Sequence, residues 1–154
     1  MPRAQNIEIV EFAEPERYAY VGHAGKYSEI KDAFERLYSY PNAKNRQLLS
    51  VWLDDPEVIP VDELRSHACF FLEPNESVVE GFQVGEIPAG RYARLEFKGP
   101  YSELIRAWKF LFELWLPHSG ERARCDAPGF EVYLKRPSKV PGDQLLTALY
   151  IALK

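Results

Sequence analysis

The sequence predicts an α+β fold made of two copies of one strand–helix–strand–strand module, related by a pseudo-twofold axis. The main observation is an internal repeat. Residues 17–38 align with residues 91–112 at a constant offset of 74, with 9 identities in 22 positions. Residues 51–72 align with residues 132–153 at an offset of 81, with 7 identities in 22. Because the two pieces follow in the same order in each half, they indicate a duplication.

Length and composition allow one core for both copies. The chain has 154 residues, of which 46% are hydrophobic and 14% aromatic, enough to bury the core of a single domain. We expect one domain over residues 1–154, with module one at about 5–74 and module two at about 80–154. No stretch approaches the roughly 20 apolar residues that span a bilayer, and the N-terminus lacks the apolar run of a secretory signal. The expectation is a soluble, monomeric, cytoplasmic protein that does not bind membranes.

Each half begins with two β-rich runs separated by a proline-containing interruption. The runs cover residues 7–12 and 18–21 in the first half and residues 82–87 and 92–97 in the second. Such a pattern is typical of either a bent strand or a tight pair of strands.

The next segment of each half has a helical period, with apolar residues on one stripe. The stripe consists of Ile30, Ala33, Phe34 and Leu37 in the first copy, and of Leu104, Ala107, Trp108, Leu111, Phe112 and Trp115 in the second. Pro41 and Pro117 are expected to end the two helices.

Two further strands follow each helix, at about 48–53 and 68–72 in the first half and at about 129–134 and 147–153 in the second. The expected architecture is therefore antiparallel sheets with two main helices and a central groove at the junction of the modules. Such a junction is a common position for a ligand.

Glu131 is the residue that most needs an explanation, because the first copy has Ser50 at the equivalent position. An ionised carboxylate between large apolar neighbours is costly to desolvate unless a cation or a hydrogen bond meets it. Strand alternation places Glu131 and Tyr133 on one face, with Phe130, Val132 and Leu134 on the other. If the apolar set packs under the helices, Glu131 and Tyr133 face the groove. The alternatives are a solvated edge-strand carboxylate and a structural salt bridge.

Several aromatic residues are candidates to line the same pocket, although each of them taken singly is more typical of the core than of a ligand wall. The predicted ligand-binding set is Glu131, Tyr133, Trp52, Ser50, Tyr20, Trp108 and Tyr150.

Charge and cysteine usage exclude several classes of function. The net charge of −4 argues against direct nucleic-acid binding, because phosphate contacts need clustered Lys and Arg. Cys69 and Cys125 lie far apart without a CxxC spacing, and the three histidines have no shared metal-ligand spacing. We expect reduced thiols, no metal site and no cofactor.

Four motifs together resemble the GyrI-like small-molecule-binding domain. They are a Gly-x-Tyr at each helix start, the Asp-Pro-Glu-Val-x-Pro segment at Asp55–Pro60, Trp-Leu-Pro-x-Ser-Gly at Trp115–Gly120, and the strand Phe130–Leu134. The resemblance extends from about Ile7 to Lys154.

The resemblance implies two modules with a cleft at their junction, and Glu131 matches the family's ligand-contacting glutamate. Members occur as effector-binding domains of MerR-type or AraC-type regulators that sense lipophilic cationic drugs. Others are stand-alone proteins involved in toxin resistance, gyrase inhibition or hydrolysis of cyclopropane toxins. The chain departs from the family pattern at Lys135 and Arg136, which replace a common acidic pair, and at Ala148 and Ala152 in the last strand.

The sequence thus supports two main functions. The first is binding of a small lipophilic, cationic or aromatic compound, with Glu131 as the anchor, for drug or toxin sensing or sequestration. The alternative is a hydrolase of electrophilic cyclopropane-type toxins, in which Glu131 acts as general acid or base and Tyr133 donates a proton. A gyrase-type protein partner, or a separately encoded regulator, is a further hypothesis that no particular residue supports.

Overall fold

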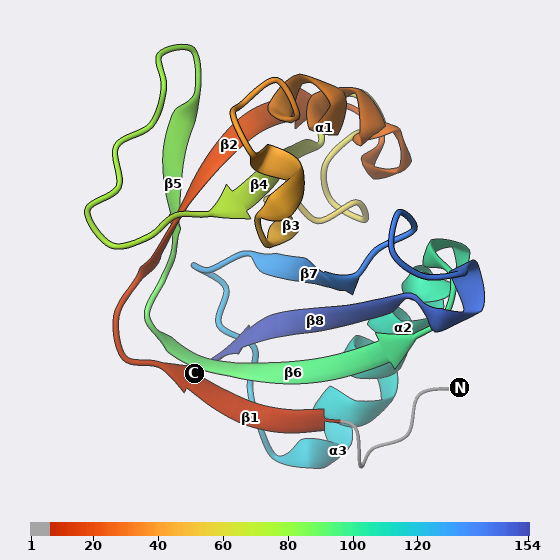
Figure 1. Cartoon of the computed structure of the whole chain (residues 1–154). Helices are drawn as coiled ribbons and strands as arrows, with labels where there is room; N and C mark the ends of the chain where they lie inside the picture. Colours follow the sequence, from red (N-terminus) through yellow and green to blue (C-terminus); the bar gives the residue numbers. More distant parts are fainter. Residues whose placement is uncertain (1–6) are drawn as a thin grey trace.

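One antiparallel sheet of eight strands organises the chain (Figure 1). The computed structural model describes residues 7–154. The strands lie in the order β1-β6-β8-β7-β3-β4-β2-β5, and all neighbouring pairs are antiparallel. The predicted α+β class is confirmed, and the sheets of the two modules join into one. The strands are β1 (Ile7–Phe12), β2 (Glu16–Ala24), β3 (Leu48–Trp52), β4 (Arg65–Phe71), β5 (Gln83–Ile87), β6 (Gly90–Lys98), β7 (Gly129–Lys135) and β8 (Leu146–Leu153).

A pseudo-twofold axis passes between β3 and β7. Followed from either end of the sheet, the strand order gives the same succession of repeat-equivalent strands. Ser50 on β3 is directly opposite Glu131 on β7 in the pairing, and the repeat alignment equates the same two positions. The position at which one copy has a carboxylate and the other a hydroxyl therefore lies on the axis, where the two modules meet.

The first strand of each copy joins the other copy's half of the sheet. β1 pairs with β6, and β5 pairs with β2. In Figure 1 the connections from β1 to β2 and from β5 to β6 cross between the halves on the same side of the molecule. Because β1 and β2 are not neighbours in the sheet, the tight-pair prediction is wrong and the bent strand is what forms. Phe12 stabilises this exchange by packing its partly buried ring 5.0 Å from that of Tyr92 on β6.

The helices are short, and the second copy has the longer helical segment. It begins with α2 (Leu104–Lys109), continues through the π-helical turn η6 (Phe110–Trp115) and ends with α3 (Leu116–Ser119); the first copy has α1 (Lys31–Leu37). Pro117 lies in the first turn of α3 and does not end the helix, which corrects the prediction. The reason is that a proline there removes no required hydrogen bond. No helix within residues 7–154 is long and apolar enough to cross a membrane.

Repeat-equivalent glycines turn each strand into its helical segment. Gly25 has a φ of 116° and Gly99 a φ of 148°, values that favour glycine. Their N–H groups donate to the carbonyl oxygens of Leu64 and Leu145, at 2.8 and 2.9 Å. This turn positions the tyrosine of each Gly-x-Tyr motif beside the sheet.

Both faces of the sheet are covered. Leu37 of α1 and Leu111 of η6 are fully buried against one face, each within a helix–sheet cluster. A third cluster, on the other face, contains Phe130 and Val132, and Leu134 packs against it. The apolar side of β7 therefore faces away from the helices, contrary to the arrangement that the sequence suggested. The curled sheet covers this face with its own strands, while Glu131 faces the helices.

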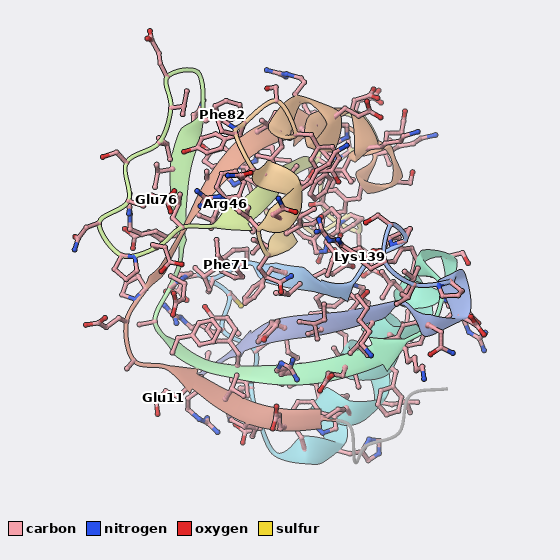
Figure 2. All side chains as sticks on the ribbon, in the orientation of Figure 1. Glu11, Arg46, Phe71, Glu76, Phe82 and Lys139 are labelled. Atoms are coloured by element: carbon pink, nitrogen blue, oxygen red, sulfur yellow. The ribbon has the colours of Figure 1, made fainter. Side chains whose placement is uncertain are left out.

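An ion pair fixes the connection between β4 and β5, which joins the two modules. The Arg46 guanidinium donates from Nη1 to Glu76 Oε1 at 3.0 Å and from Nη2 to Oε2, and Figure 2 labels both side chains. The hydrogen bonds from Arg46 lower the pKa of Glu76 to about 2. The connection between β4 and β5 is thus held to the first module by a paired carboxylate.

Candidate ligand-binding site

Glu131 lies in the middle of β7, on the pseudo-twofold axis, and is only 5% exposed. Its side chain points to the helix-covered face of the sheet because residues alternate along the strand and Phe130 and Val132 fill the opposite face. The predicted alternative of a solvated edge-strand carboxylate is excluded by this burial.

Two hydrogen bonds hold the carboxylate, one on each oxygen. Trp108 of α2 donates from Nε1 to Oε1 at 2.6 Å. The Tyr133 hydroxyl donates to Oε2 at 2.9 Å and lies 2.7 Å from Ser50 Oγ. Since the Tyr133 proton is used on the carboxylate, Ser50 is the donor in the second contact. Ser50, Tyr133 and Glu131 therefore form a short relay across the axis.

The charge of Glu131 has no cationic partner in the part of the chain that the structure describes. Within residues 7–154, no Lys, Arg or His side chain forms an ion pair with this carboxylate. Burial raises the pKa of Glu131 above its ordinary value, and the hydrogen bonds from Trp108 and Tyr133, with the Trp52 indole acting in the same direction, lower it. The salt-bridge alternative is therefore also excluded. An unpaired, buried acid remains, which is costly for a purely structural residue.

Aromatic side chains surround the acid, and they come from both copies in equivalent pairs. The ring centroids of Tyr27 and Trp52 in the first copy are 4.7 Å apart, and those of Tyr101 and Tyr133 in the second are 5.4 Å apart. Phe34, the counterpart of Trp108 in the first copy, contacts Tyr133 of the second copy, with ring centroids 6.1 Å apart. The aromatic shell is defined as Tyr27, Phe34, Trp52, Tyr101, Trp108 and Tyr133. It gives a single carboxylate a set of π-faces, the surroundings that cations prefer.

Apolar residues continue from the shell to the surface. Phe112 stacks on Trp108 with ring centroids 6.1 Å apart and is 46% exposed, while Ile105 on the same helix is 64% exposed. Tyr38 and Tyr101 are exposed as well. An apolar, solvent-accessible surface therefore lies beside the buried acid.

Comparison with known proteins identifies the family. A family model described as the GyrI-like small molecule binding domain matches residues 5–154. The chain belongs to the GyrI-like family. This confirms the resemblance seen in the sequence and establishes a small-molecule-binding domain.

This GyrI-like chain is similar to a curated protein and to two solved structures. A DNA gyrase inhibitor from Yersinia enterocolitica is 29% identical over 138 residues, which cover 83% of this chain and 85% of that protein. The C-terminal domain of EcmrR superposes with a TM-score of 0.71 at 14% identity, covering 96% of both chains. SAV2435 bound to tetraphenylphosphonium superposes with a TM-score of 0.69 at 10% identity, covering 96% of this chain and 93% of that one. The two structural comparisons establish the shared fold.

The GyrI-like domain brings five of the seven predicted ligand-binding residues together. Ser50, Trp108 and Tyr133 connect to Glu131 by hydrogen bonds, and Trp52 acts on the same carboxylate. The sequence missed Tyr27, Phe34 and Tyr101. The repeat contained the signal for all three, because Tyr27 aligns with Tyr101 and Phe34 aligns with Trp108 at the offset of 74.

Tyr20 and Tyr150 are not brought to the site. Tyr20 stacks on His67 with ring centroids 3.6 Å apart and donates to Gln83 at 2.6 Å. Tyr150 stacks on Phe130 with centroids 4.4 Å apart. Both tyrosines lie on the face of the sheet opposite Glu131, because alternation assigns their neighbours on β2 and β8 to the helix-covered face.

Substitution of Ser50 by alanine tests the relay across the axis. We expect Ser50→Ala to lower the free energy of unfolding by about 1 kcal/mol, the net value of one hydrogen bond. Tyr133 should still donate to Glu131, so ligand affinity should change far less than on loss of the acid. Urea unfolding of the two proteins measures the first effect. A variant as stable as the wild type would show that Ser50 does not hold Tyr133 in place.

Proposed function

We propose that this GyrI-like domain binds small lipophilic cations at Glu131, at the junction of the two modules, and so senses or sequesters a drug or toxin. One observation carries the proposal: a carboxylate that is 5% exposed has hydrogen bonds but no counter-charge, and six aromatic side chains surround it. A bound cation would supply the missing charge without the cost of desolvating a protein cation.

The energetics favour broad recognition over one exact ligand. Each ring face contributes about 0.5–2 kcal/mol to a desolvated cation, and rings accept cations of different shape. The Trp108 and Tyr133 hydrogen bonds keep the carboxylate oriented, while each oxygen retains further acceptor capacity. The Glu131 carboxylate therefore supplies a full charge but accepts cations of different shape.

Part of the aromatic shell must move for a ligand to reach the acid, and Tyr101 is the member best placed to move. Its counterpart Tyr27 is held in place by two hydrogen bonds. The Tyr27 hydroxyl donates to the backbone carbonyl oxygen of Asp54 at 2.6 Å and accepts from the Asp54 N–H at 2.9 Å. The structure gives the Tyr101 hydroxyl no hydrogen bond within residues 7–154, and this side chain is 37% exposed. Rotation of Tyr101 uncovers Tyr133 without breaking such a bond.

One comparison supports the cationic class. SAV2435, a protein of the same fold, has a structure bound to tetraphenylphosphonium. Tetraphenylphosphonium has a permanent charge, four aromatic rings and no N–H donor, so it suits an acid among ring faces.

Fluorescence titration with tetraphenylphosphonium tests the proposal. Binding should quench the emission of Trp52 and Trp108 in a saturable, one-to-one manner. Triphenylphosphine oxide, which is aromatic but neutral, should bind much more weakly under the same conditions. Equal affinity for the charged and neutral compounds would contradict a charge-based site.

Hydrolysis of an electrophilic toxin is a second candidate function, favoured by the Tyr133 hydroxyl at 2.9 Å from Glu131. In this function Glu131 activates a water molecule and Tyr133 protonates the leaving group. Incubation with a reactive cyclopropane compound separates the two functions. Many product molecules per protein would indicate an enzyme, and stoichiometric recovery of the unchanged compound would indicate binding alone.

A further inference from the structure

Two basic side chains lie at the outer end of the aromatic shell. Lys44, in the short helical turn after α1, places its Nζ over the Tyr38 ring at 5.2 Å from the centroid. Arg136, directly after β7, donates from Nη2 to the Lys44 carbonyl oxygen. In Figure 2 the connection that contains Arg136 and the labelled Lys139 lies beside the side chains of the α1 region. We call Lys44 and Arg136 the basic rim.

A series of edge-to-face and tilted aromatic contacts connects the basic rim to the buried acid. Tyr133, which donates to Glu131, has its ring 6.1 Å from that of Phe34. Phe34 is in turn 6.2 Å from Tyr38, the ring beneath Lys44. The path therefore has a negative inner end, an aromatic wall and a positive outer end.

The charges at the two ends do not neutralise each other. Within residues 7–154, neither Lys44 nor Arg136 forms an ion pair with an acidic side chain. Burial raises the pKa values of Tyr38 and Tyr101, and the Arg136 charge lowers both, which places this guanidinium near the two exposed tyrosines. Glu35 acts on Tyr38 in the opposite direction, but less than Arg136 does.

We propose that the preferred ligand is an aromatic zwitterion whose cationic end reaches Glu131 and whose carboxylate, or similar anionic group, binds Arg136 and Lys44 at the basic rim. This inference rests on the cation site proposed above and specifies its ligand. A guanidinium forms short, charge-assisted hydrogen bonds with carboxylates. A simple cation, by contrast, gains nothing from the rim and is repelled as it passes. Arg136, one of the two basic residues at which the chain departs from the family pattern, thus acquires a role in selecting the ligand.

A matched pair of dyes tests this inference. Rhodamine B has an aromatic cation and a free carboxylate, and rhodamine B ethyl ester has the same cation without the negative charge. Fluorescence polarisation at low and physiological salt gives both dissociation constants. We expect the wild-type protein to bind rhodamine B about 10-fold more tightly than the ester, which corresponds to about 1.4 kcal/mol. Arg136→Gln should remove most of this preference, because it should weaken the binding of rhodamine B but not that of its ethyl ester.

Control variants separate charge from structure. Lys44→Gln removes the other rim charge but keeps the backbone carbonyl that Arg136 binds, so it should reduce the preference without loosening the loop. Arg122→Gln removes an exposed charge near the end of β8 and should leave the preference unchanged. Equal wild-type affinities for the two dyes would overturn the inference that the ligand is a zwitterion. An equal loss of affinity for both dyes in Arg136→Gln would overturn it as well, and in both cases the cation site would still stand. If neither dye binds, the cation site fails as well.

Discussion

Replacement of Glu131 by glutamine is expected to weaken the binding of tetraphenylphosphonium by at least about 100-fold, or about 2.7 kcal/mol, while the fold is retained. Glutamine has nearly the same shape and still accepts hydrogen bonds, but it cannot supply the charge that holds a cation in a desolvated site. Isothermal titration calorimetry of both proteins measures the loss. Glu113→Gln, which removes an exposed carboxylate from η6, is the matched control and should bind as the wild type does.

The same variant should remove the pH dependence of binding. Only ionised Glu131 attracts the cation, and its pKa is raised above the ordinary value by burial. Affinity of the wild-type protein should therefore rise as the pH increases through this raised pKa, whereas Glu131→Gln should give a flat profile. Because tetraphenylphosphonium does not titrate, the dependence belongs to the protein. A wild-type affinity that is constant between pH 4 and 8 would contradict Glu131 as the anchor.

Folding stability should show the opposite trend for the same group. The folded state retains the Glu131 proton to a higher pH than the unfolded state does, so its stability contribution is present at low pH. That contribution is lost as the pH rises from the ordinary value of 4.5 through the raised pKa. Above this window, Glu131→Gln should be at least as stable as the wild type, and the difference should shrink on acidification. Thermal unfolding across this range measures it.

Phe130→Ala should have the largest effect on stability, because it removes a fully buried ring next to the proposed anchor in sequence. The ring is 0% exposed, stacks on Tyr150 with centroids 4.4 Å apart and contacts Tyr92 at 5.6 Å. Truncation of such a residue costs about 3–5 kcal/mol through lost burial and the cavity that remains. Urea unfolding measures this cost, and Val84→Ala on the exposed part of β5 is the control, with little expected change.

Ligand binding by the folded fraction of Phe130→Ala should nevertheless persist. Phe130 faces the core on the other side of the sheet, whereas Glu131 faces the helices, so the two neighbours act on different properties. Tetraphenylphosphonium at saturating concentration should partly restore the melting temperature of this variant by mass action. If binding is lost at temperatures where the variant is folded, the two faces are not independent.

The sequence by itself determined the modules and the position of the unusual acid. The repeat gave the order of the elements, and alternation in Phe130–Leu134 placed Glu131 and Tyr133 on a common face. Comparison of the two copies then distinguished Glu131 from Ser50. These are local properties, because the period of a strand and the equivalence of two copies are already present along the chain.

The tertiary structure decided which strands pair and which face of the sheet is covered by helices. The β-rich runs at 7–12 and 18–21 suit a bent strand as well as a tight pair, and only the apolar contact of Phe12 with Tyr92 on the other copy's β6 selects the exchange. Likewise, a period of two separates the residues of a strand into two sets but does not say which set meets the helices. Tyr20 and Tyr150 were therefore predicted to line the site and lie on the other face. Packing of distant segments against one another makes that choice.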